Sequence, residues 1–588
     1  MTHLNHETII GIDLGTTNSE VAVVQNGKVI VLKVDGSKII PSVVSKDLQG
    51  QVLIGRAAVN NELAAPTDTI RGIKRKMGRD EVVSLGNEGF TPQMISSLIL
   101  KRLKLAAEEF LKHPVHKAVI TVPAFFNEKQ REATKEAAEL AGLEPVRLLN
   151  EPTAAALAYS IGKQQGETCL VYDLGGGTFD VSIVHLSGQL MEVKASHGDT
   201  ELGGSDFDRL IADKARQAFK NDYKIDLADD PLAWARLMRS AEAAKIRLST
   251  DPAAEIVEEF IASDNGTPLH LKFKISLPEF EAMIRPALER TLASIQKALE
   301  MANLSISDIH RIILVGGATY TPLVTQMIEN EFKMTPQAWV DPSTVVAMGA
   351  AVEAASLAGE SIGPVMVDIT PHSLGTGCYD EYDHLFNVIL IRRNTPLPCS
   401  ASQVFYKKYK EQHGVQIKVY QGESINVHQC QFLGKFLLDG LEESQSQEIH
   451  IKYELDRSGL LHVTVTDIAT GKKANHTVKR VAHSRVKQGN LAEMDSVRIK
   501  VETLQVEQGS DEEFWEELGP EEEQNVSLDN VASISLEGEA TLKKAQALIE
   551  SGQLDPVDQA ELSNELEVAK AGNPEALKRL TNLIYYLE

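Results

Sequence analysis

The chain has 588 residues and is 43% hydrophobic, which is enough for about three or four domains with buried cores. Its formal net charge of −24 argues against nucleic acid as the main partner, because phosphate backbones are bound by clustered Lys and Arg. We expect neither a membrane span nor a signal peptide, since no run of about 18 apolar residues occurs and the first residues lack a basic region followed by an apolar one.

The first predicted elements are a strand, a glycine turn and a hairpin within residues 9–31. An apolar run from residue 9 leads into Asp13, and the segment after it carries Gly15, Thr16 and Thr17. Two further apolar runs flank the dipeptide Asn26-Gly27, which favours a tight turn between strands. We therefore expect a strand bearing an aspartate, followed by a β-hairpin.

Residues 70–79 are short and basic, and from the residues alone Lys74 belongs to a solvated Lys/Arg cluster. A helix is predicted over 92–112 and strands over 119–122 and 146–149. The last strand runs into Asn150, Glu151 and Pro152, and the proline favours the first turn of an Ala-rich helix. Glu151 is then either part of an ion site at a strand-to-helix corner or an acid that begins a helix.

The chain is organised around a second copy of the strand and glycine turn, at residues 170–182 with the sequence LVYDLGGGTFDVS. Three successive glycines allow backbone N–H groups to approach an anion closely. The acids beside them would repel a bare phosphate, so the pattern predicts a divalent cation such as Mg²⁺ that binds phosphate and carboxylate together. The alternative is a glycine-rich hairpin turn beside a chance acid. The residues of this predicted metal–triphosphate site are Asp173, Gly175, Gly176, Gly177, Thr178 and Asp180.

The second copy also continues into a predicted hairpin, with a strand over 179–184, a turn at Ser187-Gly188 and a strand beginning near Leu190. The copies lie about 160 residues apart, too far for a solenoid. We therefore expect two like-folded lobes, each presenting an aspartate-bearing hairpin to one cleft. A third glycine turn, at 312–319, again follows an apolar strand and contains Gly316 and Gly317.

Helices are predicted over 206–250, 277–302 and 345–357. In the first of them Glu242, Lys245 and Ser249 share one face, which as a pattern is usually solvated. Residues 359–363, GESIG, match the serine-hydrolase motif G-x-S-x-G. That motif requires a strand before it and a helix after it, so we interpret the match as accidental.

The pattern changes after the apolar segment VMVD at 365–368. From 373 to 478 the chain alternates with a period of two between glycine turns, which predicts a mostly antiparallel β domain. An acidic segment within 511–523 is interpreted as a solvated joint, and helical patterns follow to residue 586.

The three glycine-turn segments resemble the phosphate-1, phosphate-2 and adenosine motifs of actin-like ATPases, and in detail those of DnaK-type, seventy-kilodalton heat-shock chaperones. The short segment after Arg79 resembles the short HscC-like bacterial members. The resemblance implies a multidomain fold of four parts. They are an α/β actin-like two-lobed ATPase domain (7–362), an interdomain linker (363–372), an antiparallel β-sandwich for peptide binding (373–480), and an acidic joint with a short helical lid (481–588).

The resemblance implies ATP hydrolysis, with Mg²⁺ held mainly through water by Asp13, Asp173 and Glu151. Lys74 would orient the attacking water, and Asp180 would position that water or a monovalent cation such as K⁺. Thr178 completes the implied catalytic set of Lys74, Glu151, Asp173, Thr178 and Asp180. The implied nucleotide-binding set is Asp13, Gly15, Thr16, Thr17, Gly175, Gly176, Gly177, Glu242, Lys245, Ser249, Gly316, Gly317 and Tyr320. Tyr320 replaces the family's adenine-stacking arginine, and no GxxxxGK[ST] occurs, which excludes a P-loop enzyme.

The resemblance also implies that ATP controls peptide binding. Peptide-binding positions would be Phe405, Val415 and Ile417, and allosteric positions would be Pro123, Arg147, Asn150 and Asp368. The expected partners are unfolded or partly folded client polypeptides, a J-domain cochaperone and a nucleotide exchange factor. Where the family has an apolar loop over the peptide cleft, this chain carries Asp380, Glu381 and Asp383. The four cysteines are scattered without CxxC spacing, so a reduced, cytoplasmic setting is expected.

Two other classes of function compete with this hypothesis. A chaperone-like regulator or exchange factor would bind nucleotide but hydrolyse little, and the presence of Asp13, Lys74, Glu151, Asp173 and Thr178 argues against it. The second class is a sugar kinase of the same lobed fold. The long β domain and the predicted helical lid argue against it.

Overall fold

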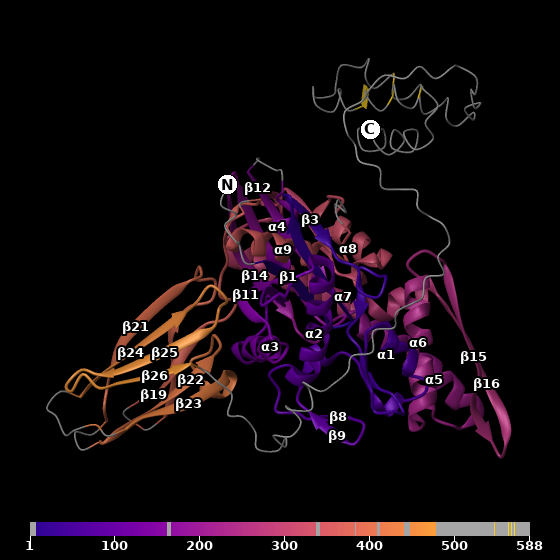
Figure 1. Ribbon diagram of the computed structural model, residues 1–588, viewed down its shortest axis with the longest axis horizontal. Coiled ribbons are helices and arrows are strands. Elements are labelled where there is room, and N and C mark those ends of the chain that lie inside the picture. Colours follow the sequence, from indigo (N-terminus) through magenta and orange to yellow (C-terminus); the bar gives the residue numbers. More distant parts are fainter. Residues whose placement is uncertain are drawn as a thin grey trace. The chain divides into compact units, whose positions relative to one another are not determined.

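The computed structural model describes most of the chain up to residue 477 (Figure 1). The described residues are 8–161, 166–336, 341–360, 362–380, 382, 384–408, 412–439, 441 and 447–477, with Gln546, Leu562, Ser563, Leu566 and Lys570 farther along. The chain divides into two compact units, Met1–Leu504 and Gln505–Glu588. The predicted acidic joint and most of the predicted helical lid therefore lie outside the described residues, as do Ser361, Glu381 and Asp383. No helix among the described residues is long and apolar enough to cross a membrane.

The first lobe is built on a sheet with strand β1 at its centre. The strand order is β11-β10-β1-β2-β3, with β4 paired to β2. The predicted hairpin at Asn26-Gly27 is confirmed, because both residues have positive φ, 54° and 74°, as a tight hairpin turn requires. The elements of this lobe are β1 (Ile9–Leu14), β2 (Asn18–Gln25), β3 (Lys28–Val31), β4 (Ile40–Pro41), β5 (Val44–Lys46), β6 (Val52–Ile54), β7 (Thr69–Ile70), β8 (Val83–Leu85), β9 (Glu88–Phe90), β10 (Lys117–Val122), β11 (Glu144–Asn150), α1 (Arg56–Asn61), α2 (Pro92–Leu111) and α3 (Glu128–Leu140).

The second lobe repeats the topology of the first. Its strand order is β17-β12-β13-β14-β18, so β12-β13-β14 form an antiparallel meander like β1-β2-β3, and β17 runs parallel to β12 as β10 does to β1. The prediction of two like-folded lobes is therefore confirmed. The elements are β12 (Glu167–Leu174), β13 (Phe179–Ser187), β14 (Leu190–Asp199), β15 (Ala253–Asp264), β16 (Thr267–Ser276), β17 (Arg311–Val315), β18 (Val365–Val367), α5 (Gly204–Tyr223), α6 (Pro231–Arg247), α7 (Leu277–Ala302) and α8 (Pro322–Phe332).

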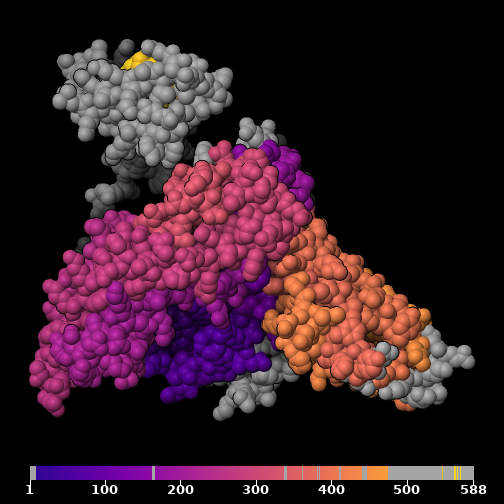
Figure 2. All heavy atoms as spheres, turned by 180° about the vertical axis from the view of Figure 1, so that it is seen from behind, coloured from indigo at the N-terminus to yellow at the C-terminus, as the bar shows by residue number. Residues whose placement is uncertain are grey.

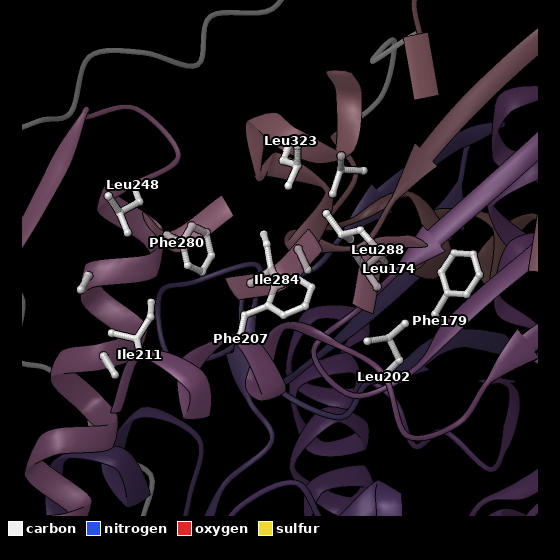
Figure 3. Close-up of a cluster of buried hydrophobic side chains, with 14 of the residues drawn as sticks. Leu174, Phe179, Leu202, Phe207, Ile211, Leu248, Phe280, Ile284, Leu288 and Leu323 are labelled. Atoms are coloured by element: carbon white, nitrogen blue, oxygen red, sulfur yellow. The ribbon is translucent and has the colours of Figure 1, made fainter. Parts of the chain in front are cut away.

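A continuous apolar core fixes the helices of the second lobe to its sheet. Phe179 of β13, Phe207 of α5 and Phe280 of α7 are fully buried in it, and Figure 3 shows their side chains within the same cluster. Burying aromatic side chains of this size removes a large apolar area from water and dominates core energetics. The core therefore holds rigid the strand ends from which the predicted phosphate site projects.

Two sequence-based expectations for this lobe were wrong or incomplete. The single helix predicted over 206–250 is two helices, because Lys224 adopts a left-handed conformation after α5 and Asp230 caps a new helix that begins at Pro231. The long hairpin of β15 and β16 was not predicted. The helices predicted at 277–302 and 345–357 are confirmed, as α7 and α9.

Helix α9 (Val345–Leu357) packs on α4 (Glu151–Tyr159), whose first residue is the predicted site residue Glu151. The two helices touch at Gly349, where an added Cβ would lie 1.7 Å from the carbonyl oxygen of Ala154. Backbone atoms meet there without an intervening side chain, so α9 sets the position of α4.

After α9 the chain enters a sandwich of two antiparallel four-stranded sheets, ordered β20-β19-β22-β23 and β21-β24-β25-β26. Its core includes Ile417, Val463 and Tyr453, and the Tyr453 hydroxyl donates to the Gly375 carbonyl, 3.0 Å away. In Figure 2 the orange surface of this domain adjoins the indigo and purple surface of the first lobe. The strands are β19 (Leu374–Tyr379), β20 (Leu385–Ile391), β21 (Cys399–Tyr406), β22 (Gly414–Gln421), β23 (Gln431–Asp439), β24 (Glu448–Leu455), β25 (Leu461–Asp467) and β26 (Lys473–Thr477).

Gly349→Ala should destabilise the two-lobed domain by about 1–3 kcal/mol, because the added methyl group forces α4 and α9 apart. The thermal unfolding midpoint of that domain should fall, measured by calorimetry on the full chain. Gly434→Ala is the matched control, since no atom lies within 4 Å of the Cβ position there. Equal midpoints for Gly349→Ala and Gly434→Ala would contradict the packing argument.

Candidate functional site

The two glycine hairpins predicted from the sequence face each other across the lobes. A Cβ on Gly176 would lie 1.8 Å from the Thr17 hydroxyl oxygen, and one on Gly177 would lie 2.7 Å from that of Thr16. Only glycine permits this approach, so the opposing hairpin itself requires glycine at positions 176 and 177. The structure brings the hydroxyl residues of the first copy directly against the glycines of the second.

Beside these hairpins, Lys74 and Glu151 form a buried ion pair. Lys74 is 3% exposed and its ammonium lies 5.9 Å from the centre of the Phe126 ring. It is therefore not a member of a solvated cluster, which was the interpretation from its neighbours alone. A buried ammonium and carboxylate compensate each other, so neither can be removed without leaving an unpaired charge.

Four acids share this cleft with one lysine. Burial raises the pKa of Glu151 to about 7, against the opposing effect of Lys74. Burial, with Glu151 nearby, also raises the pKa of Asp180 to about 7. Burial raises the pKa values of Asp13 and Asp173, and for Asp173 the neighbouring carboxylates add to the shift. Ionising all four acids in the empty cleft is therefore costly, and a bound cation would offset that cost.

The donor set fits Mg²⁺ held mainly through water. Asp13, Asp173 and Glu151 influence each other electrostatically, and oxygen is the ligand that Mg²⁺ prefers. Among the described residues no three Asp, Glu, His or Cys side chains converge closely enough to hold a metal ion directly. Mg²⁺ commonly keeps several waters, and substrate phosphates supply further ligands. A set of carboxylates that does not surround the ion by itself agrees with this mode of binding.

Neighbouring segments orient two of the aspartates. The Thr121 hydroxyl donates to the Asp13 carboxylate at 2.6 Å, and the backbone N–H of Phe125 donates to Asp180 at 2.9 Å. Thr121 lies on β10, and Phe125 lies in the loop that follows it. Strand β10 and the loop after it thus position carboxylates on both lobes.

The predicted adenosine residues lie on the second lobe. Glu242, Lys245 and Ser249 lie on α6 or directly after it, and Lys245 pairs with Asp208 at 2.8 Å. Gly316 has a φ of 84°, and its N–H donates to the Pro342 carbonyl at 3.0 Å. Gly317 begins a short 3₁₀ turn that ends at Tyr320.

Tyr320 is 53% exposed, and its hydroxyl donates to Asp341 at 3.1 Å. The hydrogen bond fixes one end of the ring while much of its surface stays open. The ring is therefore available as a stacking surface, where the family has an arginine.

Three residues of the cleft were missed by sequence reasoning. Glu20 lies opposite Asp13 in the β1–β2 register, is 2% exposed, and its Oε2 has no hydrogen-bond partner in the described part of the chain. Thr121 orients Asp13, as above. Arg75 donates to the Gly177 carbonyl at 2.9 Å and pairs with Asp206, so it ties the first lobe to the second glycine hairpin. The strand alternation that puts Glu20 on the face of Asp13 was a usable signal.

The predicted allosteric residues gather where the first lobe meets the β domain. Asn150 donates to both carboxylate oxygens of Asp368, at 3.0 and 2.9 Å, and Arg147 pairs with Glu353 of α9. Pro123 begins the loop between β10 and α3. Sequence reasoning missed three other hydrogen bonds between these domains. The Leu461 N–H donates to the Glu128 carboxylate at 2.6 Å, and the Arg131 guanidinium donates to the Ser458 carbonyl at 3.4 Å. The Leu148 N–H donates to the Ser458 hydroxyl at 3.1 Å.

The predicted peptide-binding residues lie on two strands of the sandwich. Ile417 of β22 is buried in its core at 3% exposure, and Phe405 of β21 and Val415 of β22 pack partly buried against that core. Asp380, in the loop after β19, accepts hydrogen bonds from the backbone of Tyr382 and His384, both at 2.8 Å. That loop is therefore shaped by its own aspartate.

A comparison with protein families agrees with this architecture. A family model described as Hsp70 protein matches residues 9–573, which is nearly the whole chain. Members of this family are ATPases that act as chaperones with client polypeptides and cochaperones, and their ATPase domains use ATP or ADP with Mg²⁺. The chain belongs to the Hsp70 family.

Proposed function

We propose that this protein is an ATP-dependent chaperone that binds and releases apolar segments of unfolded clients, with ATP hydrolysis coupled to peptide affinity. The observation that carries the proposal is the meeting of two aspartate-bearing hairpins beside the buried Lys74–Glu151 pair. Phosphoryl transfer depends on positioning and charge neutralisation, and this cleft offers both.

The chain's own groups divide the work of hydrolysis. Thr16, Thr17 and the N–H groups of the glycine hairpin hold phosphate oxygens, and Asp13, Asp173 and Glu151 hold Mg²⁺ through water. The ion, when bound, neutralises charge on the phosphate oxygens. Lys74 orients the attacking water and balances charge on the γ-phosphate, while Asp180 positions that water or a K⁺ ion.

Coupling would run through the linker and the domain contact. Strand β18 extends the second-lobe sheet by pairing with β14, and the next residue, Asp368, is held by Asn150. Asn150 directly precedes Glu151, so the linker contact lies one residue from the catalytic ion pair. If ATP favours this docked arrangement, ATP binding would shift the β domain between a state of high peptide affinity and a state of low peptide affinity.

A J-domain cochaperone that stimulates turnover and an exchange factor that releases ADP would complete the cycle. We further propose a reducing, cytoplasmic setting, which the scattered cysteines without CxxC spacing support. A regulator that binds nucleotide with little hydrolysis is the second candidate. Burial, with Asp13 and Asp341 nearby, raises the pKa of Glu20 well above its usual value, and an extra acid beside Asp13 would disturb the metal shell that hydrolysis needs.

Lys74→Ala should slow hydrolysis about a hundred- to thousandfold while nucleotide binding changes little, because the ammonium acts on charge that develops during the reaction. Single-turnover ATPase assays and calorimetric ADP binding measure the two effects. Lys76→Ala is the matched control, since Lys76 lies on the same turn but pairs with the exposed Glu81. Turnover within a factor of about three of the native rate in Lys74→Ala would contradict the assignment.

Tyr320→Ala should weaken ADP binding about tenfold, the loss expected for one stacking contact of about 1–2 kcal/mol. Tyr320→Phe should bind ADP nearly as the native chain does, because it keeps the ring and loses only the hydrogen bond to Asp341. Calorimetric titration with ADP measures both. If the alanine variant binds as the phenylalanine variant does, the ring is not a nucleotide contact.

Met366→Asp should abolish the stimulation of ATPase by peptide while unstimulated hydrolysis persists. Met366 packs against the core between the lobes, and a carboxylate there is costly to bury. Val365→Asp is the control, since Val365 is 68% exposed on the same strand, and it should keep its response to peptide. Peptide stimulation that survives in Met366→Asp would show that β18 is not the relay.

A further inference from the structure

The carbonyl groups of the three glycines at 175–177 all accept hydrogen bonds from outside their hairpin. Those of Gly175 and Gly176 accept from the first two N–H groups of helix α5, each at 2.9 Å. The Gly177 carbonyl accepts instead from Nε of Arg75, also at 2.9 Å. Two of these carbonyls are therefore oriented within the second lobe, and the third is oriented by a residue of the first lobe.

The directions of these carbonyls fix the directions of the N–H groups in the same peptides. In a planar trans peptide the C=O of one residue and the N–H of the next point in opposite directions. The N–H groups of Gly176, Gly177 and Thr178 therefore point away from α5 and Arg75. None of the three donates to a residue that the structure describes, and Gly177 and Thr178 are buried. Buried N–H groups without a partner are rare in folded proteins, so these indicate a bound acceptor.

The guanidinium of Arg75 is held in place by Asp206 of the second lobe. Its two terminal nitrogens donate to the two carboxylate oxygens of Asp206, at 3.0 and 2.5 Å, while Nε reaches Gly177. Asp206 also accepts from the Gly203 N–H at 2.8 Å, at the start of α5. Both charged side chains are partly exposed, so this pair contributes little to stability. Its main effect is geometric, because a planar guanidinium bound along one edge presents its Nε in a fixed direction.

We propose that Arg75 is a positioning residue for phosphate binding, which orients the peptide between Gly177 and Thr178 so that the Thr178 N–H donates to a nucleotide phosphate. Arg75 lies in a short turn of the first lobe and this peptide lies in the second, so the orientation holds only while the two lobes are closed on each other. This role rests on the proposed function and adds a residue to it. The other two N–H groups of the hairpin differ, since α5 orients them from within their own lobe.

The test is amide hydrogen exchange in the full chain at saturating ADP and Mg²⁺, read at single residues for the native protein and for Arg75→Ala. Arg79→Ala is the matched control, because Arg79 lies on the same basic segment and pairs with an acid of the second lobe, Glu201, in an exposed position. Asp206→Asn is a second variant, which loosens the guanidinium, leaves the arginine in place and keeps an acceptor for the Gly203 N–H. Calorimetric titrations with ADP and with adenosine accompany the exchange measurements.

In Arg75→Ala the Thr178 amide should lose about tenfold or more of its protection relative to the amides of Gly176 and Gly177, which keep theirs. ADP should bind about tenfold more weakly, as expected for the loss of one hydrogen bond to a charged group. Adenosine, which has no phosphate, should bind as it does to the native chain. Asp206→Asn should change the Thr178 amide in the same direction by a smaller factor, and Arg79→Ala should match the native chain.

Native protection of Thr178 in Arg75→Ala would overturn the proposal. So would an equal loss of protection at all three amides, or a loss of adenosine binding as large as the loss of ADP binding, because either result indicates a general structural effect. Equal ADP affinities for Arg75→Ala and Arg79→Ala, or no ADP binding by the native chain, would also overturn it. ADP binding without hydrolysis would contradict only the proposed function, since none of these measurements requires turnover.

Discussion

The buried ion pair between Lys74 and Glu151 is the contact on which the rest of the cleft depends. It places one positive charge among four buried acids, two of which have pKa values raised to about 7. Ionising all of these acids in the empty cleft is costly, and the cation of a metal–nucleotide complex would offset that cost.

The Lys74–Glu151 ion pair and the domain boundary are adjacent along the chain. Strand β11 ends at Asn150, which holds Asp368 of the linker, and helix α4 begins at Glu151, which holds Lys74. The two residues are consecutive, so the linker contact and the ion pair share one backbone corner, and α9 holds the helix after it by direct backbone contact at Gly349. The segment between β10 and α3 provides a second connection, from Asp180 through Phe125 to His372.

Much of this architecture could be predicted from local sequence. The turn residues Asn26-Gly27 and Ser187-Gly188 predicted both hairpins, and the repeated Asp-Leu-Gly pattern predicted the two lobes. The missed contacts join residues far apart in sequence, such as Thr121 to Asp13 across 108 positions and Leu148 to Ser458 across 310. No local pattern encodes such pairs. Lys74 shows the same limit, since the basic residues after it, Arg75 and Lys76, are only partly buried, and only the fold buries Lys74 itself.

The central claim is that nucleotide state controls peptide affinity. The most direct measurement is the dissociation rate of a fluorescent apolar peptide from the full chain, with Mg²⁺ and either ATP or ADP. The account predicts that ATP accelerates release about tenfold or more over ADP, the size of a coupling free energy of about 1.4 kcal/mol or more. Equal release rates with the two nucleotides would contradict it.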